Sequence, residues 1–343
     1  MAKKDYPEYH KHMMDQAAYP SAPRRIKFEE TPHAYLYRTG DAVYKIKKAS
    51  PVFANLALKE LYCAEGLTLG RQWAEAHVRD VVKIVKTPGG YALGGEGELV
   101  EYALVMDQLS SHYWMDYELA NNKVTPTLMG RVARFLAGRH EAHPASERDT
   151  AEAGRPEHFR ELFEEVAYQS KKYIDKALTQ PMIEMISRPM EHFVDDFRKL
   201  FVKRQKKGMI VEGHGAFLPE HLFLKGKDIS AFSPLLGQRK YRLLDQAGDV
   251  ALFLNDLHLR KRDDLGEVFL KRYQTARKDR DLPVMLAPYQ TLQAMRLALA
   301  CCERAAALNQ EKDHETQVEL HRTANTYYTL AVHQARKISK PQG

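Results

Sequence analysis

The stretch "VEGHGAFLPEHLFLKG" (residues 211–226) holds two short apolar runs with turn-forming residues between them. Gly213 and Gly215 flank His214, and glycine adopts the backbone conformations that tight turns require. The apolar run at residues 222–224 has the length and composition of a buried strand. We therefore expect a strand, a tight turn, a short loop and a second strand, which together form a hairpin over residues 209–231.

The composition is typical of a globular protein that is long enough for two domains or lobes. The 343 residues are 44% hydrophobic and 28% charged, and no apolar run approaches the length of a membrane helix. The N-terminal segment has no apolar stretch, so we expect no secretory signal. The three cysteines show neither a disulfide framework nor a metal-ligand spacing. A cytoplasmic location is the resulting expectation.

The chain is basic, with a formal net charge of +7 and a sequence pI of about 9.0. Its basic runs are short, at residues 45–48, 203–207 and 260–262, and acidic residues lie close to them. Aromatic residues are not interleaved with these runs, so platforms for base stacking are not indicated. The pattern favours solvated helix faces over a nucleic-acid partner. A basic scaffold for nucleic acid or an anionic surface remains an alternative that rests on charge alone.

Strand patterns dominate the first third of the chain. Residues 1–25 are polar and lack periodicity, which is typical of a loose or wrapping arm. Residues 26–108 contain two alternating runs around Thr39-Gly40-Asp41, one helical segment and two more strands. We interpret them as a β-rich lobe with one helix.

Helical periodicity dominates the remainder, residues 109–343, which we interpret as a second lobe. The hairpin at 209–231 interrupts it. The predicted helices cover residues 126–143, 157–178, 180–207, 245–258, 263–279, 286–309 and 314–337. A polar linker is expected between the first two of them. The fold class predicted from this layout is α+β and bilobal.

Five segments in a fixed order carry a resemblance to a known family: "ETPHAYLYRTGDAVYKIKK" (30–48), "VEYALVM" (100–106), "RQKKGMIVEGHGAFLPEH" (204–221), "DQAGDVALFLNDL" (245–257), and "FLKRY" (269–273) followed by "YQTLQAMRLALA" (289–300). The chain resembles the aminoglycoside phosphotransferase and choline-kinase-like superfamily. It is most similar to a bacterial branch that is often fused to a P-loop ATPase. The similarity covers about residues 30–304 and implies a protein-kinase-like fold. No Walker-type GxxxxGK[ST] sequence occurs in the chain.

The resemblance implies a nucleotide site in the β-rich lobe, with ATP as the expected cofactor. Lys45 matches the strand lysine that neutralises ATP phosphates, and strand alternation places Lys47 on the same face. Glu65 lies nearest to the helix carboxylate that would hold this lysine. Asp107 and Leu109 fall in the expected hinge beside the adenine. An exposed edge-strand lysine and a solvated glutamate are the structural alternatives.

The family's catalytic positions are altered in this sequence. Ala216 stands where the family has the aspartate that orients the acceptor hydroxyl, so the catalytic base is missing. His221 and Ser233 stand where the family has the asparagine and aspartate that bind Mg²⁺, an ion that prefers oxygen ligands and carboxylate charge. We therefore do not expect a magnesium site.

The resemblance and these losses together predict a pseudokinase that binds a nucleotide, a small ligand or a partner protein. The alternative is an active ATP-dependent phosphotransferase on a small hydroxylated substrate, with Glu220 as a relocated carboxylate. Asp245 and Asp249 match acidic positions that brace the loop in the family. His140 and His143 have a spacing that could bind metal, but packing or capping is the expected role.

Overall fold

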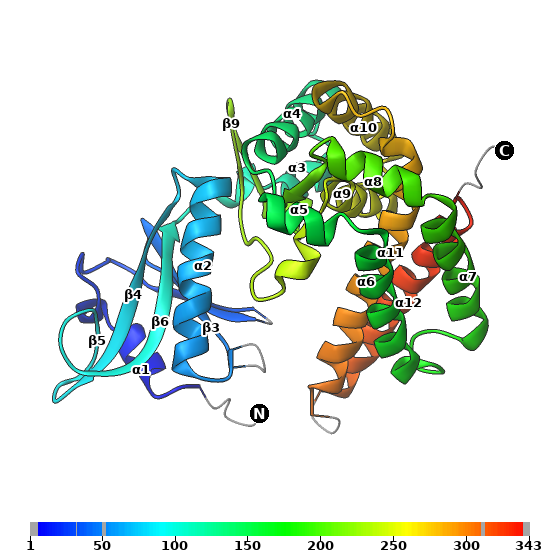
Figure 1. Cartoon of the computed structure of the whole chain (residues 1–343). Helices are drawn as coiled ribbons and strands as arrows, with labels where there is room; N and C mark the ends of the chain where they lie inside the picture. The colour runs from blue at the N-terminus through cyan, green and yellow to red at the C-terminus, as the bar shows by residue number, and fades with distance from the viewer. Residues whose placement is uncertain (1–5, 32, 50–52, 310–312, 339–343) are drawn as a thin grey trace. The chain divides into compact units, whose positions relative to one another are not determined.

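The computed structural model describes residues 6–31, 33–49, 53–309 and 313–338 of the chain (Figure 1). The chain divides into two compact units. The first consists of Met1–Glu118 and His221–Gly237, and the second of Leu119–Glu220 and Gln238–Gly343. An antiparallel sheet dominates the first unit and helices dominate the second, which confirms the predicted α+β class. No helix of the described residues is long and apolar enough to cross a membrane.

The first unit is built on a six-stranded antiparallel sheet in the order β1-β2-β3-β6-β4-β5. In chain order its strands are β1 (Lys27–Glu30), β2 (Ala34–Arg38), β3 (Ala42–Lys47), β4 (Val78–Thr87), β5 (Gly90–Leu93) and β6 (Glu98–Asp107). The tight turn between β2 and β3 uses the positive φ of Gly40, +99°, as predicted for a hairpin at this glycine. Helix α2 (Leu56–Ala74) packs on β4 and β6 and begins at Asn55, whose side chain accepts the N–H of Leu58.

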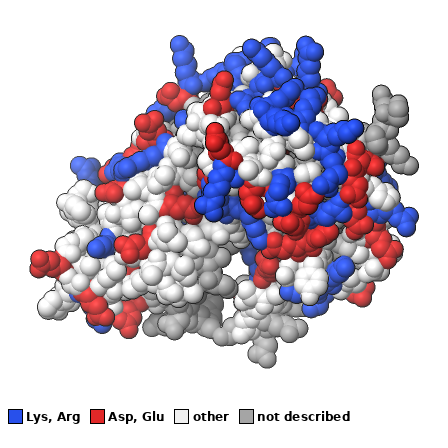
Figure 2. All heavy atoms as spheres, in the orientation of Figure 1, with Lys and Arg blue, Asp and Glu red and all other residues white. Residues whose placement is uncertain are grey.

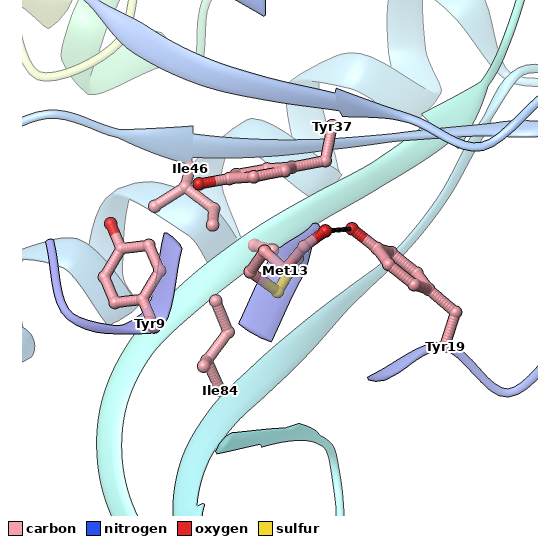
Figure 3. Close-up of a cluster of buried hydrophobic side chains, with 7 residues drawn as sticks. Tyr9, Met13, Tyr19, Tyr37, Ile46 and Ile84 are labelled. Carbon is pink, nitrogen blue, oxygen red and sulfur yellow. Dashed lines mark hydrogen bonds between the residues drawn. The ribbon is translucent and has the colours of Figure 1, made fainter. Parts of the chain in front are cut away.

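The described part of the N-terminal arm wraps onto this sheet (Figure 3). Helix α1 (Tyr9–Met13) and the 3-10 turn η1 (Gln16–Ala18) bring Tyr9, Met13 and Tyr19 into a buried cluster with Tyr37 and Ile46. The hydroxyl of Tyr19 donates to the carbonyl of Met13 at 2.7 Å, which satisfies both groups inside the cluster. Because Tyr9, Met13 and Tyr19 pack against Tyr37 and Ile46, the arm covers the face of β2 and β3 on which these two side chains lie. Residues 1–5 lie outside the described part.

The predicted hairpin over residues 209–231 is wrong in its pairing. Strand β8 (Leu222–Lys225) pairs with β9 (Asp228–Ala231) around Gly226, within the first unit. Strand β7 (Ile210–Glu212) pairs instead with β10 (Leu243–Asp245), within the second unit. The chain after β7 stays with this pair, because the N–H of Gly213 donates to the carbonyl of Arg242 at 2.8 Å.

The second unit is helical. Its main helices are α4 (Pro126–Ala142), α5 (Glu147–Ala153), α6 (Pro156–Ser170), α7 (Gln180–Asp196), α8 (Arg198–Lys206), α9 (Ala247–Leu259), α10 (Asp263–Arg277), α11 (Leu282–Ala306) and α12 (His314–Ala335). The short helix α3 (Met115–Ala120) spans the division between the units. The predicted helix at 180–207 is two helices that meet at Phe197. The predicted polar linker contains α5, whose first turn is capped by Ser146 and carries Glu147 and Asp149.

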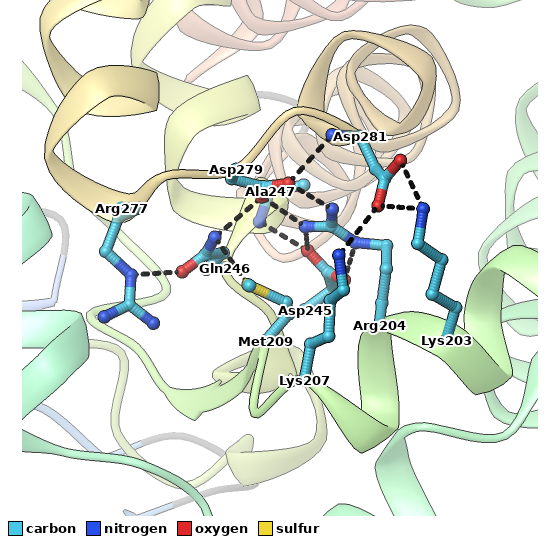
Figure 4. A network of polar contacts seen from close by, with 10 residues as sticks. All are labelled: Lys203, Arg204, Lys207, Met209, Asp245, Gln246, Ala247, Arg277, Asp279 and Asp281. Carbon is cyan, nitrogen blue, oxygen red and sulfur yellow. Dashed lines mark hydrogen bonds and ion pairs between the residues drawn. The ribbon is translucent and has the colours of Figure 1, made fainter.

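A buried ion network holds α8 to the start of α9 (Figure 4). The guanidinium of Arg204 donates to both oxygens of Asp245, at 2.5 and 2.8 Å, and to both oxygens of Asp279, at 2.7 and 2.8 Å. Asp245 also accepts the N–H of Ala247, at the first residue of α9. Paired forks of this kind satisfy a buried charge with fixed geometry. Asp245 has the predicted structural role at the helix start, but its described contacts join α8 to α9 and do not brace the loop around Ala216.

Candidate functional site

Lys45 is the cation of the candidate site in the first unit. It lies on β3, on the face opposite Tyr44 and Ile46, and its Nζ donates to the Oγ of Ser233 at 3.1 Å. Burial, reinforced by the nearby charge of Lys47, lowers the pKa of Lys45 to about 7. Among the described residues no carboxylate forms an ion pair with it. The site therefore holds a desolvated ammonium group whose polar contact is a neutral hydroxyl.

Lys47 places a second amine on the same face of β3. Its Nζ lies 5.3 Å from the centre of the Phe53 ring, within the range of a cation–π contact. Burial lowers the pKa of Lys47, and the nearby Cys63 opposes this effect. Within the described chain Lys47 has no carboxylate partner either. Strand alternation in the sequence already places Lys47 on the same face as Lys45, but Lys47 was not among the predicted site residues.

Glu65 does not hold Lys45 in this structure. Its Oε2 accepts the N–H of Gly237 at 3.1 Å, so the predicted helix carboxylate braces the segment after Ser233 instead. In the ion pair between α2 and the sheet, the helix supplies the cation and the strand supplies the anion. Lys59 of the helix pairs with the buried Glu101 of β6. Lys45 therefore lacks the carboxylate partner that an active kinase site uses.

The predicted hinge residues, Asp107 and Leu109, contact other residues of the first unit. The carboxylate of Asp107 accepts from Nε of Arg79 at 2.6 Å and contacts Nδ1 of His77 at 3.0 Å. Although burial raises a carboxyl pKa, these partners hold the pKa of Asp107 below its ordinary value. Leu109 packs in an apolar cluster that includes Phe223 and Phe232. Any contact of these residues with an adenine remains a prediction.

The two positions that bind metal in the family lie at the open end of the β8–β9 hairpin. The N–H of Phe232, next to Ser233, donates to the carbonyl of His221 at 2.8 Å. Ser233 has a left-handed backbone, φ +57°, which is uncommon for a residue other than glycine. It precedes a proline, which disfavours the right-handed helical conformation at this position. An imidazole and a hydroxyl that accepts from Lys45 do not fit Mg²⁺. Nowhere in the described part of the chain do three or more His, Cys, Asp or Glu side chains form a group that could hold a metal.

The loop around Ala216, in the second unit, keeps a braced shape. The Oδ2 of Asp249 accepts the N–H of His214 at 2.7 Å, and its Oδ1 accepts the N–H of Gly215 at 2.8 Å. A side chain at Gly213 would meet Asp249, since a Cβ there would lie 2.5 Å from Oδ2. The predicted bracing role of Asp249 is thus confirmed. The loop positions Ala216, whose methyl group can neither accept a proton nor bind a metal.

The histidines of α4 are structural. His140 is buried, with Nε2 3.1 Å from Oδ2 of Asp249 and Nδ1 2.6 Å from the hydroxyl of Tyr273. His143 caps the helix, and its N–H donates to the carbonyl of Arg139. The expectation of packing and capping roles is confirmed. Glu220, the predicted relocated carboxylate, lies in the short 3-10 turn η5 (Pro219–His221) and is exposed to solvent.

Charge is unevenly distributed over the surface in view (Figure 2). Lys and Arg side chains gather over the region of α4 and α10, and both signs are interspersed elsewhere. Arg134 and Arg272, both exposed, lie over Gly130, because a Cβ there would contact each of them within 3.8 Å. Part of the chain's excess of basic residues thus lies exposed in this cluster.

Comparison with solved structures identifies the fold. A choline kinase from Cryptosporidium parvum Iowa II aligns with a TM-score of 0.54 at 11% identity, over 94% of each chain. A choline/ethanolamine kinase family protein from Mesorhizobium loti aligns with a TM-score of 0.52 at 12% identity, over 96% of this chain and 100% of its own. The aminoglycoside 2'-phosphotransferase-IIIa, solved as a GDP complex, aligns with a TM-score of 0.52 at 16% identity, over 94% of this chain and 99% of its own. The chain has the fold of these kinases. The predicted bilobal, protein-kinase-like architecture and the resemblance to this superfamily are confirmed at the level of fold.

Sequence comparison is less informative. No protein-family model matches the chain. Uncharacterised proteins of Mycobacterium tuberculosis (strain H37Rv) and Mycobacterium bovis are each 26% identical over 259 residues, which cover 72% of this chain. The chain spans about half the length of these curated relatives, 49%. The comparisons therefore support a phosphotransferase-like fold and do not assign an activity.

Proposed function

We propose that this protein is a catalytically degenerate phosphotransferase homologue that binds a phosphate-bearing ligand, such as a nucleotide, at Lys45. The observation that carries the proposal is the 3.1 Å hydrogen bond from Lys45 to Ser233. It leaves a desolvated ammonium group with a neutral contact and, among the described residues, without a counter-charge. A phosphate oxygen is a stronger partner for this group than a hydroxyl, because charge-assisted hydrogen bonds are about twice as strong as neutral ones.

The altered catalytic positions support binding without turnover. Phosphoryl transfer by kinases requires a group that orients the nucleophile and oxygen ligands that hold Mg²⁺. Ala216, His221 and Ser233 provide neither a carboxylate nor an amide at these positions. The loop is nevertheless braced by Asp249, as expected where the shape of the site is retained and its chemistry is lost.

Two alternatives follow from specific residues. An active phosphotransferase would use Glu220, whose exposed carboxylate lies in the same loop as Ala216. A scaffold for an anionic surface would use the basic cluster of Arg134 and Arg272 on α4 and α10. We rank both below the ligand-binding function, because the hydrogen bond from Lys45 to Ser233 fixes the position of the amine in that function.

Calorimetric titration with ATP tests the proposal at its central residue. Lys45→Ala should weaken binding by about 1–3 kcal/mol, the range for a hydrogen bond to a charged group. Lys83→Ala is the matched control, because Lys83 is an exposed lysine on β4 of the same sheet. Equal affinities of the wild type and Lys45→Ala would show that the phosphates do not lie at Lys45.

A further inference from the structure

Arg296, on α11, is a second cation that lies beside an altered catalytic position. Its Nη2 donates to the carbonyl of Gly215 at 2.6 Å, directly before Ala216 in the chain. Its Nε donates to Oε1 of Gln293 at 2.9 Å, and its guanidinium lies 5.4 Å from the centre of the Tyr241 ring. All of these residues belong to the second unit. Three contacts thus fix the guanidinium at the loop.

No carboxylate neutralises this guanidinium within the described residues. The carboxylate whose charge acts on it, Asp249, already accepts the N–H groups of His214 and Gly215 and contacts Nε2 of His140. Burial lowers the pKa of Arg296 to about 10, although the charge of Asp249 opposes this shift. A guanidinium has five N–H donors, and the described contacts use two of them. A desolvated cation that forms no ion pair among the described residues is energetically unfavourable, and such groups are common at functional sites.

We propose that Arg296, which the carbonyl of Gly215 holds beside Ala216, is a receptor for an oxyanion, a phosphate or carboxylate group of a bound molecule. A guanidinium binds such groups through two parallel N–H donors, and the replacement of the family's aspartate by Ala216 removes the carboxylate that would otherwise compete. The inference rests on the proposed function in one respect, that the loop is the acceptor side of a phosphotransferase-like fold. It changes the expected acceptor from a neutral hydroxyl compound to an anionic one.

The test uses thermal unfolding of the full chain in a Lys45→Ala background, which removes the phosphate contact proposed for the first unit. Inorganic phosphate and malonate are each compared with chloride at equal ionic strength. One of them should raise the Tm of this parent by about 2 °C or more. A phosphate response that depends on Arg296 assigns a phosphate group, and a malonate response that depends on Arg296 assigns a carboxylate. If neither probe stabilises the parent, the receptor does not exist.

Arg296→Gln should remove this response. The control is Arg304→Gln, which makes the same change of charge on the same helix and should keep the full response. Anions that are excluded from protein surfaces stabilise every variant alike, so the difference between variants is the readout. A residue that only anchors Gly215 would lower the Tm when replaced but leave the response unchanged. An unchanged response in Arg296→Gln would therefore overturn the proposal.

A second variant keeps the test valid if Arg296→Gln does not fold. Ala216→Asp should place a carboxylate against Arg296, raise the Tm without any added anion and abolish the response to phosphate and malonate. A response equal to that of the parent would overturn the receptor. An Arg296-dependent response in a protein that binds no ATP would contradict the proposed function alone. ATP binding that depends on Lys45, without any response at Arg296, would contradict the receptor alone.

Discussion

At the scale of single residues, Lys45 is the group on which the proposed ligand binding in the first unit depends. Its ammonium group is desolvated, its hydrogen-bond acceptor is the hydroxyl of Ser233, and Lys47 adds repulsion. The pKa of about 7 means that the folded protein releases this proton far below the 10.5 of a free lysine. Stability contributed by neutral Lys45 therefore rises as the pH increases from about 7 to 10.5, because the unfolded chain holds the proton in that window.

Ligand binding should depend on pH in the opposite sense. A phosphate binds the protonated form of Lys45, so affinity should be highest below pH 7 and fall above it, by at most about tenfold per pH unit. Phosphate esters are dianionic above about pH 7, so the ligand itself does not produce this fall. Calorimetry at about pH 8 in two buffers should detect proton uptake. Lys45→Arg remains charged and should bind independently of pH, and a flat profile in the wild type would contradict the assignment.

At the scale of elements, the loop that carries Ala216 depends on one carboxylate of α9. Burial alone would raise the pKa of Asp249, but the hydrogen bond and charge of His140 hold it below the ordinary value. Asp249 thus accepts two backbone N–H groups as an anion inside the second unit. This arrangement accounts for the shape of the loop independently of any catalytic side chain.

Asp249→Asn should be strongly destabilising. The amide cannot replace both carboxylate oxygens, so at least one buried N–H loses its acceptor, at a cost of about 3 kcal/mol or more. Urea unfolding measures the change. The control Asp264→Asn affects an exposed aspartate that pairs with Arg262 and should change stability by about 1 kcal/mol at most. Because the pKa of Asp249 is lowered, the deficit should be full at neutral pH and shrink only below 3.8.

Elements with a local signal could be predicted from the sequence. The β2–β3 turn at Gly40 and the facing of Lys45 and Lys47 follow from turn chemistry and strand alternation, both of which act between near neighbours. The pairing of β7 could not be predicted in this way, because its partner β10 lies about thirty residues along the chain. The same limit applies to Arg296 and Gly215, which are 81 positions apart. The contact between Lys45 and Ser233 requires, in addition, a left-handed serine that no local pattern indicates.

At the scale of the whole molecule, two of the positions that differ from the family's pattern carry less negative charge than the family has there. Ala216 and Ser233 lack the negative charges that the family has there. Lys45, Lys47 and Arg296 are cations that form no ion pair within the described residues. Our proposals of an anionic ligand in each of the two units rest on this distribution of charge.

The active alternative makes a different prediction for Glu220. If the protein transfers phosphate, Glu220→Gln should reduce the rate by about 10²–10⁴, the range for loss of a general base. We expect no transfer to water or to hydroxylated acceptors by the wild type, and no effect of Glu220→Gln on ATP affinity. Radiolabelled ATP gives the readout. Transfer that disappears in Glu220→Gln would establish an enzyme and contradict the degenerate assignment.

The most direct test of the central claim is the affinity for ATP measured with Mg²⁺ and with a chelator. Because His221 and Ser233 provide no suitable ligands for Mg²⁺ and Lys45 supplies the positive charge, we predict binding in both conditions, with dissociation constants that agree within about threefold. Lys45→Ala should weaken both. Binding that requires Mg²⁺, or no binding in either condition, would contradict the account.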